Sequence, residues 1–344
     1  MKVKKSLALG MAACMGMQLL CACSRQRTDK IEKVQMGVTC YDQSDTFISS
    51  VIDSLKEQLG QYQNEGVTAT VTVMDAAGLQ RTQNDQIEEL ISSGCNVLCV
   101  NLVDRTDPSE IIDLARKNNV PIIFFNREPV AEDMLQWSEL YYVGAYAEQS
   151  GVLQGELAAE AIKADNGIDR NRDGKIQYVV LEGEPGHQDA IIRTETAVNT
   201  LKENGILLEK LSYGIANWSR AQAQNRMTQM IGQHGDKIEL VLGNNDDMVL
   251  GAIDTYEKLN FTKASWPVFF GIDGTDVGLE AVLDGRLAGT VYNDKEGQAG
   301  AMVKLAVALV IGEGMDEIEF EDDRYIYLPY RKVTSGNAGE FLAE

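Results

Sequence analysis

The stretch Asn96-Val97-Leu98-Cys99-Val100-Asn101 decides the fold class. Its unbroken apolar run, bounded by two asparagines, predicts a short strand whose side chains are buried on both faces. Such strands are typical of a parallel sheet with helices on either side. From Val34 onward the chain repeats this pattern, because short β-branched runs alternate with amphipathic segments of helical period.

The alternation runs twice, with a charge-rich interruption at 126–140 that predicts a lid or a connection between two sheets. Before it we expect strands at 34–38, 67–73, 97–101 and 121–125, and helices at 47–61, 86–93 and 109–118. After it we expect strands at 177–181, 207–213, 240–242, 268–272 and 287–291, and helices at 148–164, 190–204, 219–234, 248–259 and 277–284. The chain is therefore expected to be an α/β protein with two doubly wound parallel-sheet lobes.

The N-terminus predicts export. Residues 1–22 have a basic start, an apolar stretch at 7–20 and then Leu20-Cys21-Ala22-Cys23, which is typical of a signal peptide. Small residues before Cys23 resemble the bacterial lipobox, so we expect lipidation of Cys23 and a tether over 23–33. The mature protein would then be anchored at the outer face of the cell membrane or held in the periplasm. The alternative is a simple signal peptide with incidental cysteines.

Composition excludes several classes of protein. The formal net charge of −21 repels nucleic acid and anionic lipid, so we expect no nucleic-acid partner. The mature chain would keep Cys40, Cys95 and Cys99. Cys95 and Cys99 would lie about 13 Å apart along an extended strand, too far for a disulfide. All three cysteines are expected in the core. The protein is expected to be a monomer.

Polar residues follow most of the predicted strands. Their positions are Asn101, Asn126, Asn245, Asp273 and Asn293. Ligands of open α/β sheets bind at the carboxyl ends of the strands, so these amides and carboxylates are expected to converge on one cleft. Such a mixture of donors and acceptors suits a polyhydroxylated ligand. At any single position, capping of a turn is the alternative.

A second motif predicts a calcium loop. Oxygen ligands at alternate positions and a glycine at the sixth are typical of EF-hand-like loops, and the sequence offers Asp169, Asn171, Asp173, the carbonyl of Lys175, and Gln177, with Gly174 at the turn. The bidentate Glu of position 12 is missing, since Val180 stands there. A further ligand from elsewhere is needed, or the segment is an acidic turn before a strand.

Several segments together resemble the bacterial galactose/glucose-binding proteins, the substrate-binding components of ABC importers. The segments are Asn84-Asp85-Gln86-Ile87, Asn101-Leu102-Val103-Asp104, Phe124-Phe125-Asn126-Arg127-Glu128-Pro129, Tyr141-Tyr142-Val143-Gly144, Gly183-Glu184-Pro185-Gly186-His187, Asn244-Asn245-Asp246 and Ala288-Gly289-Thr290-Val291. The resemblance covers roughly residues 35–341. It implies a type I periplasmic-binding-protein fold, whose two lobes are joined by three hinge crossings and enclose the sugar.

The resemblance also implies the lobes and the site. The N-terminal lobe would comprise 34–125 and 294–328, and the C-terminal lobe 126–293 and 329–344. The implied sugar-binding residues are Asp45, Phe47, Asn101, His187, Asp189, Arg193, Trp218, Asn245, Asp273 and Asn293. Phe47 and Trp218 would sandwich the pyranose ring, although either aromatic could instead belong to the core. Glu239 would supply the missing calcium ligand.

The implied ligand is D-galactose, D-glucose or a methyl galactoside, and the implied partner is an ABC permease. An alternative keeps the same site but presents the sugar to a membrane chemoreceptor or sensor kinase. Gln188 departs from the family, which usually has Pro there, and so does the segment at 42–44. The sequence has only two histidines and lacks both a G-x-S-x-G elbow and a P-loop, which disfavours an enzyme. A transcription regulator would need a helix-turn-helix where the export signal stands.

Overall fold

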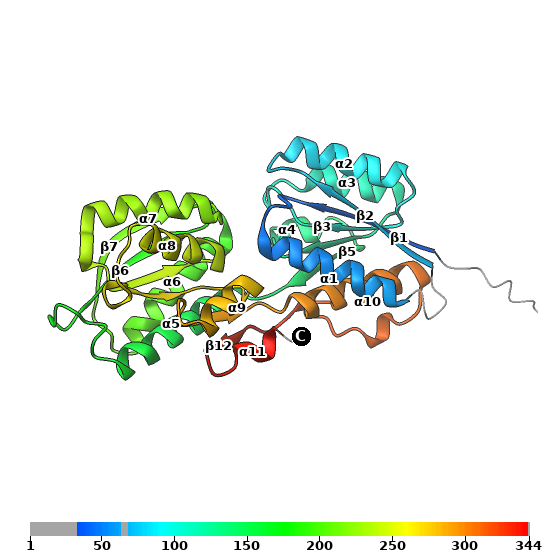
Figure 1. Ribbon diagram of the computed structural model, residues 1–344. Helices are drawn as coiled ribbons and strands as arrows, with labels where there is room; N and C mark the ends of the chain where they lie inside the picture. Colours follow the sequence, from blue (N-terminus) through cyan, green and yellow to red (C-terminus); the bar gives the residue numbers. More distant parts are fainter. Residues whose placement is uncertain (1–32, 63–67, 343–344) are drawn as a thin grey trace, which may run out of the picture. The chain divides into compact units, whose positions relative to one another are not determined.

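The computed structural model describes residues 33–62 and 68–342, which form a six-stranded, a four-stranded and a two-stranded sheet (Figure 1). All strand pairs of the two larger sheets are parallel, and helices lie on both faces of each. The predicted α/β class with two parallel-sheet lobes is therefore confirmed. The leader, the tether up to residue 32 and Cys23 lie outside the described residues.

The six-stranded sheet has the order β11-β5-β4-β3-β1-β2. Its strands are β1 (Lys33–Cys40), β2 (Thr68–Asp75), β3 (Val97–Val100), β4 (Ile122–Phe125), β5 (Leu140–Gly144) and β11 (Tyr325–Tyr327). The helices of this lobe are α1 (Thr46–Tyr62), α2 (Gln80–Ser92), α3 (Ser109–Asn118), α4 (Ala131–Met134) and α10 (Lys295–Ile311).

The four-stranded sheet has the order β7-β6-β8-β9. Its strands are β6 (Ile176–Glu182), β7 (Leu208–Ile215), β8 (Leu240–Gly243) and β9 (Val268–Phe270). Beside it, β10 (Thr290–Tyr292) and β12 (Arg331–Val333) form an antiparallel pair. The helices are α5 (Ala147–Ala164), α6 (Gln188–Glu203), α7 (Arg220–His234), α8 (Asp246–Lys258), α9 (Asp276–Leu283) and α11 (Ala338–Phe341).

Strand β3 shows why the central strands are apolar on both faces. Val97 and Cys99 belong to the core cluster that α1 and α10 cover, whereas Leu98 and Val100 belong to the cluster under α2 and α3. All four residues are buried. Because side chains alternate along a strand, a sheet with helices on both sides leaves no face for polar residues. Polar side chains are consequently found where the strands end.

The chain passes between the two large sheets three times within the described residues. It leaves the first sheet after β5, returns after β10 into α10, and leaves again between β11 and β12. Helix α10 packs on α1, and β11 pairs with β5, so both return to the first lobe. These three passages agree with the hinge that the resemblance implies.

The structure corrects one predicted lobe boundary and two elements. Strand β5 pairs with β4 in the first sheet, so the first lobe extends to Gly144 and does not end at residue 125. Helix α2 begins at Gln80, ahead of the predicted residue 86, since its first turns are polar and lack apolar periodicity. Helix α10 was not predicted, because its small apolar residues are spread around the helix without a clear stripe.

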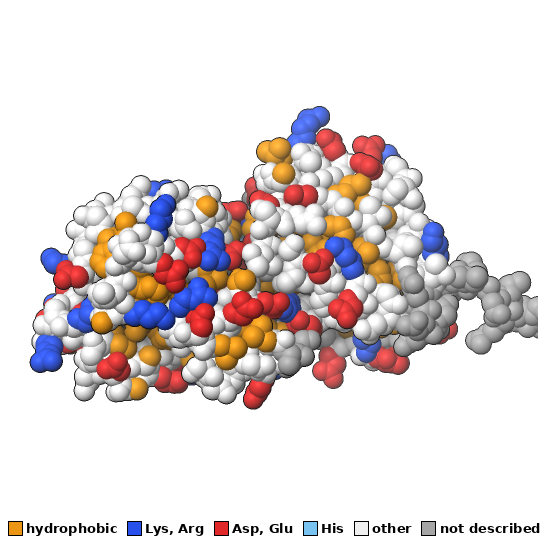
Figure 2. All heavy atoms as spheres, viewed as in Figure 1, with side chains coloured by type: hydrophobic (Ala, Val, Ile, Leu, Met, Phe, Trp, Pro, Cys, Tyr) orange, Lys and Arg blue, Asp and Glu red, His pale blue; other side chains and the backbone are white. Residues whose placement is uncertain are grey.

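The remaining sequence expectations concern the surface and the cysteines. Cys40, Cys95 and Cys99 are free thiols in the core, as predicted. On the face shown in Figure 2, Asp and Glu side chains lie among Lys and Arg side chains and form no single acidic patch. Among the described helices, none has the length and apolar character needed to cross a membrane.

Asp246, the first residue of α8, is a fully buried carboxylate. Its Oδ2 accepts from the backbone N–H of Thr275 at 2.9 Å, and its Oδ1 accepts from the hydroxyl of Thr290 at 2.6 Å. A methyl group at Gly271 or Gly278 would stand 2.1 or 2.3 Å from these oxygens, so the pocket around Asp246 has no spare room. Burial raises the pKa of Asp246 to about 7, and the hydrogen bonds only partly offset this.

The raised pKa of Asp246 gives stability a defined pH dependence. Between about pH 4 and 7 the folded protein binds this proton and the unfolded chain, with a carboxyl pKa near 3.8, does not. The free energy of unfolding should therefore fall as pH rises through this window, by at most about 1.4 kcal/mol per pH unit from this group. Asp246→Asn should flatten that slope in urea titrations, whereas Asp53→Asn on the exposed face of α1 should not. Equal slopes in wild type and Asp246→Asn would contradict this assignment.

Candidate functional site

A pocket lies at the carboxyl ends of the strands and is lined from both lobes. The lining residues are Tyr41, Asp45, Phe47, Ile48, Asn126, Arg127, His187, Asp189, Arg193, Trp218, Asn245 and Asp273. Eight of the ten residues that the resemblance implies are among them. The free volume is about 30 Å³, which is room for no more than a few water molecules.

Asn101 and Asn293, the other two implied residues, are buried but are not among the lining residues. The side-chain amide of Asn101 donates to the carbonyl of Phe125 and to Oδ1 of Asn126, both at 3.1 Å. Oδ1 of Asn293 accepts from the side-chain amide of Gln298 at 2.7 Å. In this arrangement both asparagines tie together the ends of strands and the segments after them.

Arg127 lines the pocket, although the strand-end pattern named only its neighbour Asn126. Its guanidinium lies 3.5 Å above the centre of the Tyr41 ring and donates to the carbonyl of Val103 at 3.0 Å. It also pairs with Glu184 of the other lobe at 3.1 Å. Arg127 is only 4 % exposed, so this charge is held by partners on both sides. In the sequence, the one sign of this role was an arginine placed directly after Asn126, the asparagine that follows the predicted strand at 121–125.

Asp45 has both carboxylate oxygens occupied by the first lobe. Oδ1 accepts from the backbone N–H of Ile48 in the first turn of α1, at 3.0 Å. Oδ2 accepts from the hydroxyl of Tyr41 at 2.6 Å. Burial, together with the Asp45 charge, raises the pKa of that tyrosine, so Tyr41 stays protonated and acts as a donor. Asp45 thus presents a fixed, oriented acceptor.

His187 is the N-cap of α6 and is held neutral. Its Nδ1 accepts from the backbone N–H of Asp189 at 3.1 Å, which places the proton on Nε2. Burial, and then the charges of Arg127 and Arg193, lower the pKa of His187 to about 2. A histidine with so low a pKa is a hydrogen-bond donor at neutral pH and a poor general base.

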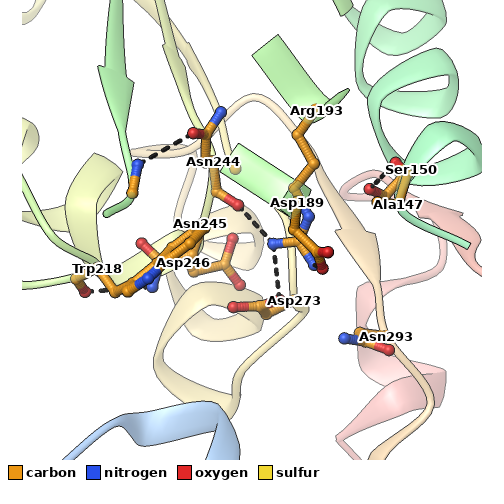
Figure 3. A network of polar contacts seen from close by, with 12 residues as sticks. Ala147, Ser150, Asp189, Arg193, Trp218, Asn244, Asn245, Asp246, Asp273 and Asn293 are labelled. Carbon is orange, nitrogen blue, oxygen red and sulfur yellow. Dashed lines mark hydrogen bonds and ion pairs between the residues drawn. The ribbon is translucent and has the colours of Figure 1, made fainter. Parts of the chain in front are cut away.

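Arg193 is the charged centre of the pocket (Figure 3). Its Nη1 donates to the carbonyl of Asn244 at 2.7 Å. Its Nη2 donates to the hydroxyl of Tyr330 at 3.0 Å. Asp189 and Asp273 each place a carboxylate oxygen 3.6 Å from the guanidinium. Nε of Arg193 is buried and has no partner in the described part of the chain. This leaves one donor of a buried guanidinium available to a ligand.

The pKa values of the two carboxyl groups beside Arg193 are both raised, because burial outweighs the charge of the guanidinium. Burial raises the pKa of Asp189, and the positive charge of Arg193 lowers it. Burial raises the pKa of Asp273 more strongly, with Arg193 again opposing. Arg193 is the nearest side-chain partner of one oxygen of each carboxylate. Together they offer acceptors on two sides of a single cation.

Trp218 and Asn245 form the far wall. The side-chain amide of Asn245 donates to the carbonyl of Trp218 at 3.2 Å, while its Oδ1 caps α8 through the N–H of Met248 at 3.0 Å. Nε1 of Trp218 is buried and, like Nε of Arg193, has no partner among the described residues. The ring packs against core residues of both lobes, so its role as a pocket wall and its core contacts coexist.

Backbone strain gathers at the pocket. Asn126, Trp218 and Asp273 have φ of 60°, 62° and 113°, in the left-handed region that L-residues rarely adopt. Such conformations cost of order 1–3 kcal/mol each and persist where the surrounding structure enforces them. Three of the twelve lining residues are strained in this way. Strain at these positions fixes the direction of side chains that the strand ends alone would leave variable.

The predicted calcium loop connects α5 to β6. Its side chains converge: the Asn171 amide donates to Oε1 of Gln177 at 2.9 Å, and the Gln177 amide donates to Oδ2 of Asp173 at 2.9 Å. Gly174 has φ of 80°, which allows the sharp turn at the sixth position. A hydrogen bond from the backbone N–H of Lys175 is the main cause that lowers the pKa of Asp173.

Glu239 reaches this loop from the start of β8. Its Oε1 accepts from the N–H of Arg170 at 2.7 Å, and its Oε2 accepts from the N–H of Gln177 at 3.1 Å. Glu239 is buried, so a carboxylate stands at the place the resemblance implies. His, Cys, Asp and Glu side chains alone form no metal-binding group of three or more in the described ranges. A cation here would depend equally on the amide and carbonyl oxygens of the loop.

The comparisons with known proteins agree with this geometry. A family model for the periplasmic binding protein domain matches residues 36–314. The chain is 36% identical over 317 residues to the D-galactose/methyl-galactoside binding periplasmic protein MglB of Haemophilus influenzae, covering 90% of this chain and 92% of that one. It is 25% identical to the ribose import binding protein RbsB of Escherichia coli, covering 64% of this chain and 68% of the other.

Solved structures show the same fold. A solute binding protein of an ABC transporter from Bacillus halodurans, with bound myo-inositol, is similar with a TM-score of 0.75 at 29% identity, covering 92% of this chain and 99% of that one. One from Actinobacillus succinogenes with bound D-allose has a TM-score of 0.75 at 19% identity, covering 89% of this chain and 99% of the other. With two parallel-sheet lobes, three passages between them and a polar pocket at their strand ends, the chain belongs to the periplasmic binding protein family and has its type I fold.

Proposed function

We propose that this protein captures a monosaccharide outside the cytoplasm and delivers it to the permease of an ABC importer. The proposed ligand is D-galactose, D-glucose or a methyl galactoside. The observation that carries the proposal is a polar pocket in which one buried donor, Nε of Arg193, lacks a partner within the described residues. A ligand rich in hydroxyl groups would supply an acceptor to this donor.

The chemistry of the lining suits a pyranose. Each hydroxyl both donates and accepts, and an unpaired buried hydroxyl costs on the order of 1 to 3 kcal/mol. Asp189 and Asp273 accept, His187 donates through Nε2, and Asn245 lies beside them. The apolar C–H face of a sugar ring would rest on Trp218, and Phe47, which also lines the pocket, would cover its second face.

The choice of sugar follows the relative that has the highest sequence identity, 36%, among those described above. That protein is named for D-galactose and methyl galactoside, whereas others are named for ribose or were solved with myo-inositol or D-allose. A calorimetric panel of galactose, glucose, methyl galactoside, ribose, allose and myo-inositol separates these possibilities. Tight binding of ribose or inositol, with none of galactose or glucose, would reassign the ligand within the same class of site.

Removal of the aromatic wall or of a carboxylate should weaken binding in this pocket. Trp218→Ala should lose roughly 1 to 3 kcal/mol of hexose binding, by analogy with stacking on aromatic platforms. Asp189→Ala should lose a similar or larger amount, because Arg193 would keep only Asp273 beside it. Isothermal calorimetry measures both, with Trp137→Phe as a control away from the pocket. Unchanged hexose affinity in both variants would place the sugar elsewhere.

We also propose a structural calcium ion in the loop that follows α5. Its ligands would be Asp169, Asn171, Asp173, the carbonyl of Lys175, Gln177 and Glu239. The support is the convergence of the loop side chains and the buried Glu239 carboxylate beside both ends of the loop. The ion would join the segment before β6 to the start of β8. Its contribution is structural, and the sugar site lies at the other end of these strands.

Calcium removal should lower the melting temperature, because the ion binds the folded state only. At a free concentration 100-fold above the dissociation constant, such binding stabilises by about 2.7 kcal/mol. Glu239→Gln should lose most of the difference between melts in Ca²⁺ and in EDTA, and Arg172→Ala, a loop change outside the ligand set, should retain it. If verified metal removal leaves the wild-type melt unchanged, the site does not exist.

We propose, finally, that Cys23 is lipidated and anchors the protein at the outer face of the cell membrane. The proposal rests on the sequence Leu20-Cys21-Ala22-Cys23 alone. Cys23→Ala should release the protein from the membrane fraction with sugar binding intact. Intact-mass spectrometry provides the direct check, since a mature wild-type chain without diacylglycerol would rule the anchor out.

A further inference from the structure

Gly183 and Trp218 leave the second sheet side by side. Gly183 follows β6, Trp218 comes shortly after β7, and the last residues of these two strands, Glu182 and Ile215, are paired neighbours. The indole ring folds back over the glycine. A methyl group built at Gly183 would stand 2.1 Å from Cζ2 of Trp218 and within 2.4 Å of two further ring atoms.

This contact, and not backbone conformation, is the reason for a glycine. Gly183 has no left-handed φ, so any residue could adopt its backbone. Its N–H donates to Oδ1 of Asn244 at 3.1 Å, a bond that a side chain at this position would not remove. What a side chain would do is occupy the space of the indole. The indole ring therefore occupies the space that a Cβ atom at residue 183 would need.

The ring has little freedom to move aside. The backbone of Trp218 is strained at φ 62°, and its carbonyl is held by the amide of Asn245 at 3.2 Å. The edge of the ring meets His187, with centroids 5.0 Å apart and planes at 77°. His187 is itself fixed as the N-cap of α6. A displaced indole would have to shift toward the pocket or disturb these contacts.

We propose that Gly183 is a positioning residue of the binding site, whose missing side chain sets the depth at which the Trp218 ring stands in the pocket. The ring would then face the apolar side of the sugar at a fixed height. This inference rests on the proposed sugar-binding function for its consequence in affinity. The position of the ring can be measured without any ligand.

The first test reads the ring directly in Gly183→Ala. The chain has three tryptophans, so protein labelled with 5-fluorotryptophan gives three ¹⁹F resonances, and Trp218→Phe identifies one of them. Gly183→Ala should shift the Trp218 resonance and leave those of Trp137 and Trp266 in place, which also reports an intact fold. An unshifted Trp218 resonance would overturn the proposal.

The second test is a double-variant cycle with D-galactose as the probe. Gly183→Ala should weaken binding about tenfold or more, comparable to the loss of an aromatic platform. In a Trp218→Ala background the same change should add little, because no ring remains to be displaced. Gly232→Ala, on α7 with no atom near the added methyl, is the matched control and should bind as wild type. Equal losses in both backgrounds would overturn the proposal.

The remaining outcomes are also informative. If Gly183→Ala fails to fold, the double variant Gly183→Ala/Trp218→Ala should recover a cooperative melt, since the clash is gone. Failure of that double variant as well, with Trp218→Ala folded, would show that Gly183 is needed for another reason. If wild-type protein binds no hexose, the proposed function falls, while the ¹⁹F measurement still decides the role of Gly183.

Discussion

The rest of the site depends on the need to hold one buried guanidinium, that of Arg193. A buried charge is tolerated only when partners surround it, and here they come from four parts of the second lobe and the hinge. Asn244 follows β8, Tyr330 lies in the last passage between the sheets, and Asp189 and Asp273 each place a carboxylate beside the guanidinium. Loss of any one of these partners would leave the buried guanidinium less well compensated. The strand ends are thereby fixed relative to one another before any ligand arrives.

Much of the fold could be predicted because both large sheets follow one rule. Runs that are apolar on both faces, such as Val97 to Val100, belong to covered parallel sheets, and the residue after the run lies at the ligand edge. The rule failed at β5, where the preceding charge-rich segment suggested a change of lobe although Leu140 simply pairs beside β4. Local composition carries no information about which sheet a strand will join.

The site was predicted less completely, and for a related reason. A strand-end asparagine can face a ligand or can bond to neighbouring strands, and its sequence position is the same in both cases. Asn245 lines the pocket, whereas the side-chain amide of Asn101 donates to the carbonyl of Phe125 and to Oδ1 of Asn126. Arg127 was missed because its importance arises from the ring of Tyr41 and the carboxylate of Glu184, both distant in sequence. Such pairings exist only once the chain is folded.

The contact between Arg127 and Glu184 has a kinetic consequence. It joins the two lobes, as does the bond from the hydroxyl of Thr46 to Asp247, and the free volume of the pocket, about 30 Å³, is smaller than a sugar ring. A sugar ring can occupy this pocket only if the lobes move apart, which loosens these inter-lobe contacts. The cost of breaking these contacts then enters the rate of dissociation, which sets the residence time.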